Sequence, residues 1–428
     1  MRSKVAAAAV AAFVLVLTAA CGGGDGDDSA QADARGPIKI WLSNNPEEIE
    51  WGKKMVEAWN AEHPDEEVTA QEIPAGETSE EVIAAAITAG NAPCLVFNTS
   101  PAAVPQFQKQ GGLVALDSFD GATEYIEQRS GDVAEQYKSP DGQYYQIPWK
   151  SNPVMIFYNK DLFKKAGLDP ENPPLSTHDE FLQTSRKIVE SGAAQAAIWP
   201  APTSEFFQSW FDFYPLFAAE TGGQQLVEDG EATFDSEAGM TVAELWATMY
   251  EEGLAQQEAY NGDAFGEQKS AMSIVGPWAI AVYGEAVNWG AVPVPTSEGI
   301  APEETYTFSD AKNIGLYSAC ENQGTAFDLL KFATSEEQDG QLLEMTGQMP
   351  LRQDLTGTYP EYFEENPEYQ DFADQASRTV EVPNVPNSIE IWQTFRDSYS
   401  ESVIFDKTPV EDALSSAAEE ASELASQS

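Results

Sequence analysis

Short apolar runs alternate with amphipathic segments along the first hundred residues of the chain. The run IKIWL at 38–42 predicts a buried strand, and a cap, proline and glutamate over 45–48 predict the start of a helix. Two further strands are expected over 68–73 and 94–97, with a helix over 79–89 between them. This β-α-β-α-β order is typical of a parallel, doubly wound sheet.

Ligands of such sheets bind beyond the carboxyl ends of the strands. The polar tips that follow the first and third predicted strands are therefore the first candidate binding residues. They are Ser43, Asn44, Asn45, Asn98, Thr99 and Ser100.

The rest of the chain repeats this mixed pattern. Strands are expected over 154–158, 272–275, 289–294 and 313–318, separated by helical segments, and the chain reads as helices from residue 361 onward. A chain of 428 residues exceeds what one hydrophobic core usually organises. We therefore expect an α/β protein with two domains.

The amino-terminal sequence predicts an export signal. A short basic start precedes an apolar run over 5–17, which is too short to span a bilayer comfortably, and a Gly- and Asp-rich stretch follows Cys21. The sequence LTAAC at 17–21 resembles a bacterial lipobox, with Thr18 where that pattern usually has Leu. The alternative is a secreted chain in which Cys21 is a free thiol. The expected segments are a signal peptide over 1–20 and a lipid-anchored flexible leash over 21–36.

The charge balance limits the partners. With 71 acidic and 22 basic residues the formal net charge is −49, which repels nucleic acid and anionic lipid head groups. We expect no nucleic-acid partner, and membrane contact through the lipid anchor only. The acidic residues are spread along the whole chain, as on a solvated surface.

Common catalytic and cofactor motifs are missing from the sequence. The only histidines are His63 and His178, and there is no HExxH, P-loop, GxSxG or CxxC. We therefore expect no cofactor, no metal and no enzymatic activity. A glycosidase needs only two suitably placed carboxylates, so an exported glycosidase stays open as an alternative.

Aromatic residues are abundant, and several stand in polar or Gly/Pro-rich surroundings. Trp149, Trp278 and Trp392 are candidates for stacking on the CH face of a pyranose ring. The competing interpretation for each of them is an anchor in the hydrophobic core.

Three stretches stand out by their order and spacing: YQIPW at 145–149 with IFYNKDLFKKAGL at 156–168, AMSIVGPW at 271–278, and NIGL at 313–316 with GQMPLR at 347–352. Together they resemble the family of extracellular solute-binding proteins that includes maltose-binding protein. The resemblance spans nearly the whole chain beyond the leash.

The resemblance implies a two-lobed periplasmic-binding-protein fold with a ligand cleft between the lobes. One lobe is expected over 37–148 plus 310–348 and the other over 152–308 plus 352–428. The implied function is capture of a sugar or oligosaccharide by hinge closure, and delivery to the permease subunits of an ABC transporter. The protein is expected to act as a monomer on the outer face of the cell membrane.

The resemblance also implies roles for particular residues. Trp278 and Trp392 would stack on the sugar, and the strand tips, which are neutral here and charged in maltose-binding protein, would bind its hydroxyls. Four polar residues beside the crossings between the lobes could reach the cleft: Lys150, Asn152, Asp310 and Arg352. For Arg352 a structural ion pair is the competing interpretation.

A disulfide between Cys94 and Cys320 follows from the same resemblance. In this family the third strand is antiparallel to the strand that returns to the first lobe, so the start of one meets the end of the other. The alternative ligands are a polyamine or a peptide, and a cationic ligand would need inward carboxylates such as Glu47 or Asp310.

Overall fold

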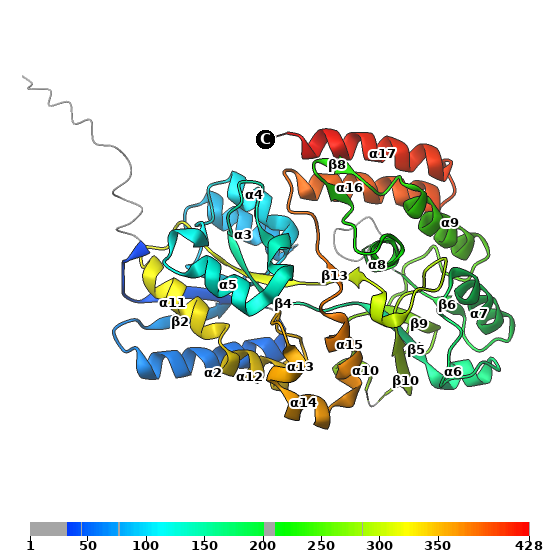
Figure 1. The fold of residues 1–428 in the computed structure, drawn as a ribbon, viewed down its shortest axis with the longest axis horizontal. Coiled ribbons are helices and arrows are strands. Elements are labelled where there is room, and N and C mark those ends of the chain that lie inside the picture. The colour runs from blue at the N-terminus through cyan, green and yellow to red at the C-terminus, as the bar shows by residue number, and fades with distance from the viewer. Residues whose placement is uncertain (1–31, 44, 76–77, 201–209, 285, 428) are drawn as a thin grey trace, which may run out of the picture.

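A five-stranded sheet organises the first lobe (Figure 1). The structure is a computed structural model and describes residues 32–43, 45–75, 78–200, 210–284 and 286–427. In the strand order β2-β1-β3-β12-β4, β1 is parallel to β2 and β3, and β12 is antiparallel to β3 and β4. The strands are β1 (Ile38–Leu42), β2 (Val68–Glu72), β3 (Leu95–Thr99), β4 (Gln146–Lys150) and β12 (Lys312–Leu316).

Helices cover both faces of this sheet because successive residues of its strands point to opposite sides. Ile40 of β1 belongs to a core with Trp51, whereas its neighbour Trp41 belongs to a second core with Ile83 and Phe107. The helices are α2 (Pro46–Glu62), α3 (Ser79–Thr88), α4 (Val104–Lys109), α5 (Ala122–Ser130), α11 (Gln323–Ala333) and α12 (Glu336–Thr346).

A four-stranded sheet in the order β10-β5-β9-β6 forms the centre of the second lobe. The strands are β5 (Met155–Asn159), β6 (Ala196–Ile198), β9 (Ser270–Val275) and β10 (Trp289–Val292). The helices are α6 (Lys160–Lys165), α7 (His178–Glu190), α8 (Trp210–Thr221), α9 (Glu237–Glu251), α10 (Trp278–Tyr283), α13 (Leu355–Thr358), α14 (Pro360–Glu365), α15 (Gln370–Gln375), α16 (Ser388–Tyr399) and α17 (Val410–Ala425). Two short strand pairs are also present: β7 (Val227–Glu228) with β8 (Glu231–Ala232), and β11 (Thr307–Phe308) with β13 (Thr379–Val380).

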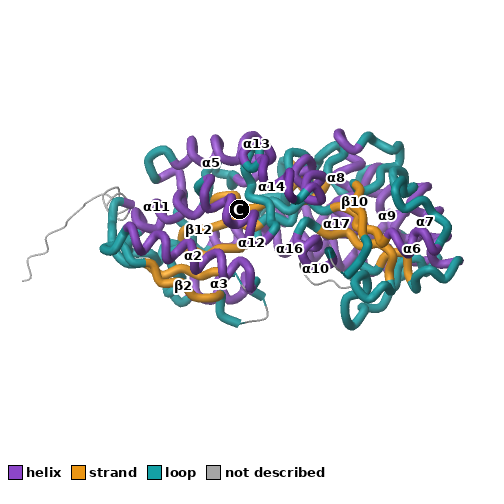
Figure 2. Tube along the Cα trace, turned by 90° about the horizontal axis from the view of Figure 1, so that it is seen from below, coloured by secondary structure: helices purple, strands orange, loops and turns teal. Residues whose placement is uncertain are grey.

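The two sheets lie side by side, and the chain crosses between them several times (Figure 2). Pro153 pairs with Ser309 and Lys150 with Pro350 at these crossings, and the hydroxyls of Ser151 and Ser309 are 2.7 Å apart. Crossings that lie together are typical of a hinge. The lobe bounds expected above remain our proposed division of the chain.

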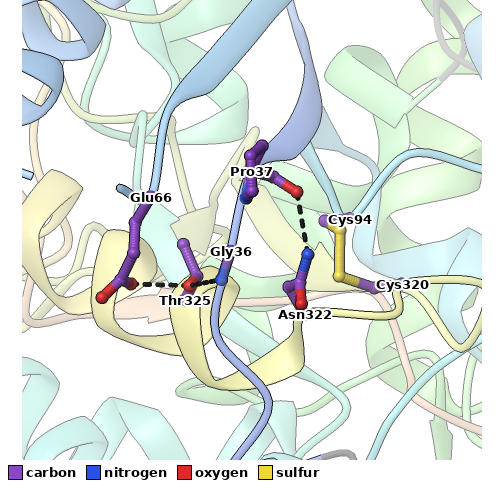
Figure 3. Close-up of a disulfide and its surroundings, with 7 residues drawn as sticks. All are labelled: Gly36, Pro37, Glu66, Cys94, Cys320, Asn322 and Thr325. Atoms are coloured by element: carbon purple, nitrogen blue, oxygen red, sulfur yellow. Dashed lines mark hydrogen bonds between the residues drawn. A yellow bond between two sulfur atoms is a disulfide. The ribbon is translucent and has the colours of Figure 1, made fainter. Parts of the chain in front are cut away.

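Cys94 and Cys320 form a disulfide, with their Cα atoms 4.6 Å apart (Figure 3). The register of β3 and β12 explains the pairing: Leu95 lies opposite Leu316, so the residue before β3 approaches the turn that follows β12. The bond therefore joins two strands of the first sheet that are far apart in the sequence.

The folded part begins earlier than the sequence predicts. The expected leash ended at Gly36, but Arg35 forms ion pairs with Asp328 and Glu66, and Gly36 N donates to Thr325 Oγ1 at 3.1 Å. These partners belong to α11 and to the turn before β2, which local sequence patterns do not reveal. The predicted signal peptide and Cys21 lie outside the described residues. In the described ranges, no helix combines the length and apolar character that crossing a bilayer requires.

Candidate functional site

A cleft of about 810 Å³ lies between the two lobes. Its first-lobe wall includes the ends of β1, β3 and β4 and the carboxyl end of α12, and its second-lobe wall includes α10 and the segment from α14 to Tyr369. The cleft brings together these predicted site residues: Asn45, Asn98, Lys150, Asn152, Trp278 and Asp310.

The tip of β1 places Asn45 at the cleft as the N-cap of α2. Its Oδ1 accepts a hydrogen bond from Glu48 N at 3.0 Å, and its own N donates to Ser43 Oγ at 2.9 Å. Ser43 is buried and does not line the cleft, because this bond holds it against the helix start. Asn44 lies outside the described residues.

The tip of β3 contributes Asn98, which adopts a left-handed backbone with φ of 66°. Asparagine tolerates this conformation better than most residues, and such backbone is often found at functional sites. Thr99 and Ser100 are both buried and do not line the cleft: Thr99 Oγ1 donates to Val96 O, and Ser100 N donates to Glu80 Oε1, each at 3.4 Å. Only the first of the three predicted tip residues therefore faces the ligand space.

A buried charge pair lies at the base of the cleft. Lys150, which is 1% exposed, donates to the carboxylate of Glu48 and, at 2.6 Å, to Gln348 Oε1. Burial works to raise the pKa of Glu48, but the Lys150 ammonium and the hydrogen bonds hold that pKa below its usual value. Burial also lowers the pKa of Lys150, with the carboxylate of Glu48 opposing the shift.

A second ion pair joins Asp310 and Lys312, whose charged atoms are 2.7 Å apart. Asn152 lies beside it: Asn152 Nδ2 donates to Asp310 O at 3.2 Å, and Asp310 N donates to Asn152 O at 3.0 Å. Burial works to lower the pKa of Lys312, but the charge of Asp310, its hydrogen bond and the nearby carboxylates of Glu80 and Glu381 together raise it. Both cleft lysines are thus matched with a carboxylate.

Trp278 supplies the aromatic surface of the cleft from the first turn of α10. Its ring is half-buried and lies 6.0 Å from the ring of Phe211. A Cβ added at Gly276 would lie 1.9 Å from the Trp278 ring, so the glycine two residues earlier leaves the space that this ring occupies. The Gly-Pro-Trp sequence therefore fixes the position of the indole.

The predictions for Trp149 and Trp392 as ligand contacts are wrong in this structure, because both rings are buried in hydrophobic cores. Trp149 is 1% exposed and lies 5.4 Å from both Trp51 and Phe97. Trp392 is 5% exposed and lies 5.7 Å from Tyr214. The competing interpretation, a core anchor, describes both.

Arg352 also lies outside the cleft. It pairs with Asp339 at 3.0 Å and donates to Thr334 O at 3.1 Å, beside the fully buried pair of Arg129 and Asp339. Arg352 therefore forms a structural ion pair, which was the competing interpretation of this residue, and does not contact the ligand space.

Sequence reasoning missed parts of both walls of the cleft. The missed lining residues belong to α10 (Ala281 and Val282), to the carboxyl end of α12, and to the segment from Glu361 to Tyr369. None of them lies directly at the tip of a predicted strand, so the rule that located the polar tips could not find them. In the described part of the chain, no three His, Cys, Asp or Glu side chains are grouped so as to hold a metal ion.

The profile of the bacterial extracellular solute-binding protein family matches residues 45–340, and the chain belongs to this family. It is 25% identical to the maltodextrin-binding protein MdxE of Bacillus subtilis over 292 residues, 64% of each chain. It is also 25% identical to the diacetylchitobiose binding protein DasA of Streptomyces coelicolor over 351 residues, 77% of each chain. The matched stretch spans less than two thirds of the Bacillus protein's length.

A shorter likeness, 44% identity over 63 residues, covers 15% of this chain and 14% of the sn-glycerol-3-phosphate-binding periplasmic protein UgpB of Agrobacterium fabrum. Among solved structures, a cyclic alpha-maltosyl-1,6-maltose binding protein from Arthrobacter globiformis superposes with a TM-score of 0.78 at 20% identity, over 91% of this chain and 99% of that one. The GacH receptor of Streptomyces glaucescens superposes with a TM-score of 0.73 at 24% identity, over 91% and 98% of the two chains. The predicted two-lobed α/β fold is confirmed.

Proposed function

We propose that this chain is the substrate-binding component of an ABC importer and that it captures a sugar or an oligosaccharide between its lobes. The observation that carries the proposal is an indole face in a cleft that is also lined by two asparagines whose side-chain oxygens are buried without a partner. Among the described residues, Asn98 Oδ1 and Asn152 Oδ1 have no hydrogen-bond partner. A pyranose offers a CH face to Trp278 and hydroxyl donors to these two oxygens.

The charges of the cleft favour a neutral ligand over an anion. Lys150 and Lys312 are each engaged by a carboxylate, so neither is available as the dedicated cation that a phosphate needs. Four exposed carboxylates on the rim add to the repulsion of an anion: Glu47, Glu344, Glu361 and Glu365. We therefore place a sugar ahead of a glycerol phosphate.

The same four carboxylates support a second candidate, a polyamine or a cationic peptide. Such a ligand would gain from several carboxylates facing it at once. The indole surface favours the sugar, because a linear amine offers no extended CH face for stacking.

The proposed mechanism is hinge closure at the crossings between the lobes, followed by delivery of the enclosed sugar to the permease. No bond is made or broken. The chain would act as a monomer, exported and held at the outer face of the membrane by a lipidated Cys21. Two acyl chains would anchor it stably, because each buried CH₂ contributes about 0.8 kcal/mol.

Thermal unfolding with candidate ligands tests the proposal. Maltotriose and N,N′-diacetylchitobiose represent sugars, with glycerol 3-phosphate, spermidine and a lysine tripeptide as the other arms. A ligand at 100 times its Kd stabilises a protein by about 2.7 kcal/mol, which gives a clear shift in Tm. Trp278→Ala should abolish the sugar shift, whereas Phe405→Ala, which removes an exposed aromatic ring that does not line the cleft, should keep it.

The outcomes separate the candidates. A shift with spermidine or the peptide alone would establish the second candidate, and a shift with glycerol 3-phosphate alone would contradict the charge argument. Consumption of the sugar during the assay would identify an enzyme. Stabilisation by sugars that persists in Trp278→Ala would overturn the assigned site.

A further inference from the structure

One face of α10 extends the apolar surface of the cleft beyond Trp278. Trp278, Ala281 and Val282 follow one another at helical spacing, and all three line the cleft. Ala279 and Ile280 lie on the opposite face and are 1% and 6% exposed in the core of the second lobe. The face that remains open to the cleft is apolar over its whole length.

Val282 is unusually exposed for an apolar side chain in a concave site. It is 60% exposed, and in the described ranges the only other exposed large hydrophobic side chain is that of Phe405, at 39%. A single exposed apolar residue on a convex surface needs no explanation. Inside a cleft that already carries an aromatic platform, it is typical of a ligand contact.

Tyr362 of α14 lines the same cleft from a different segment. Its half-buried ring lies 5.3 Å from Phe363 and 5.7 Å from Tyr369. Tyr369 is itself fixed against Gly347, where φ is +66° and an added Cβ would lie 2.4 Å from the tyrosine hydroxyl. A ring held in this way loses little conformational entropy when a ligand binds.

Polar groups accompany this second aromatic surface. Asn366 lines the cleft one turn after Tyr362, and its Nδ2 donates to Tyr362 O at 2.9 Å. Glu365 lines the cleft beside it and is exposed. Trp278 likewise shares the cleft with amide and carboxylate side chains, those of Asn98, Asn152 and Asp310.

We propose that Val282, Tyr362 and Asn366 form a further subsite that binds an additional ring of a longer oligosaccharide. The inference rests on the proposed function and narrows the ligand to a chain of several sugars. Val282 lies four residues, or about 6 Å of helix, after Trp278 along α10, which is comparable to the step between neighbouring rings of a glycan. The cleft volume of about 810 Å³ leaves room for more than one ring, since ligand pockets span about 300–1,000 Å³.

Calorimetric titration of the full chain with a series of increasing length tests this subsite. The probes are maltose to maltohexaose, and N,N′-diacetylchitobiose to its tetramer. Wild-type affinity should rise with length until the subsite is filled. Val282→Asp and Tyr362→Ala should each weaken the longer ligands by about 5- to 10-fold while leaving the shortest bound ligand within about twofold. Phe405→Asp is the matched control, since it places the same charge at the other exposed hydrophobic position, outside the cleft.

The titrations distinguish a failure of the subsite from a failure of the proposed function. If the wild-type protein binds these sugars but Val282→Asp and Tyr362→Ala keep its length dependence, the subsite is refuted and the proposed function stands. Equal weakening of short and long ligands, or a wild-type affinity that does not change with length, also refutes it. If the wild-type protein binds no member of either series, the proposed function fails, and the subsite fails with it.

Discussion

Removing the disulfide between Cys94 and Cys320 should change the stability of the protein without changing its affinity for the ligand. Both sulfurs are buried, and the bond closes a separation of 226 residues between β3 and the turn after β12. Asn98, the cleft residue of β3, lies four residues from Cys94, which is about 13 Å along an extended strand. Loss of the bond should therefore destabilise the first lobe without changing the cleft.

The chain-entropy relation gives the size of the effect. For a loop of this length, the cross-link removes unfolded-state entropy equivalent to about 5 kcal/mol at 25 °C, as an upper figure. This is comparable to the whole free energy of unfolding of many domains, about 5–15 kcal/mol. Because about 5 kcal/mol is an upper figure at the low end of that range, the protein should remain folded when reduced, with a clearly lower denaturation midpoint.

Urea denaturation with and without a thiol reductant measures this. The reductant should lower the midpoint of the wild-type protein but not that of a Cys94→Ala/Cys320→Ala variant, which controls for every other effect of the reductant. Sugar affinity, measured below the transition, should be equal in both proteins. Identical wild-type midpoints in the two conditions, or two reactive thiols from these cysteines in unreduced denatured protein, would refute the reasoning.

Two further predictions concern buried charges. Lys150→Met should destabilise the protein by about 3–5 kcal/mol, because it leaves the Glu48 carboxylate buried without its cation, and adding Glu48→Gln should restore most of that loss in urea denaturation. Burial raises the pKa of Glu381 to about 8. The folded state therefore binds more protons than the unfolded state between about pH 4.5 and 8, and stability should fall as pH rises through that window. Glu381→Gln should reduce the dependence of the free energy of unfolding on pH in that window, and an unchanged dependence would contradict the argument for Glu381. A Lys150→Met variant as stable as wild type would contradict the argument for the pair of Lys150 and Glu48.

Local patterns predicted the first lobe well. The strand expected over 38–42 is observed as Ile38–Leu42, and the helix expected over 79–89 is observed as Ser79–Thr88. The third strand was expected to end at Phe97 because polar residues follow, yet it continues to Thr99 because Thr99 pairs with Asn313. Apolar periodicity identified the element, and a long-range partner determined its end.

The candidate site was predicted where strand topology or the family resemblance located it. Asn45 and Asn98 lie at strand tips and do line the cleft, as the doubly wound order requires. Trp149 was chosen for its residue type, but every residue of β4 is buried, so this indole contacts Trp51 and Phe97 instead of a ligand. Residue type alone cannot distinguish a stacking platform from a core anchor, because both need the same flat apolar ring.

The wall formed by Tyr362 and its neighbours had no local signal, because its position depends on contacts with both lobes. Tyr359 donates to Glu336 O of α12 at 2.8 Å, and Phe363 packs in a core with Phe157 of β5. This segment thus reaches the cleft independently of the strand tips. Tyr362 and Asn366, which we assign to the length of the sugar chain, therefore come from a different part of the sequence than Asn98 and Asn152, whereas Val282 shares α10 with Trp278.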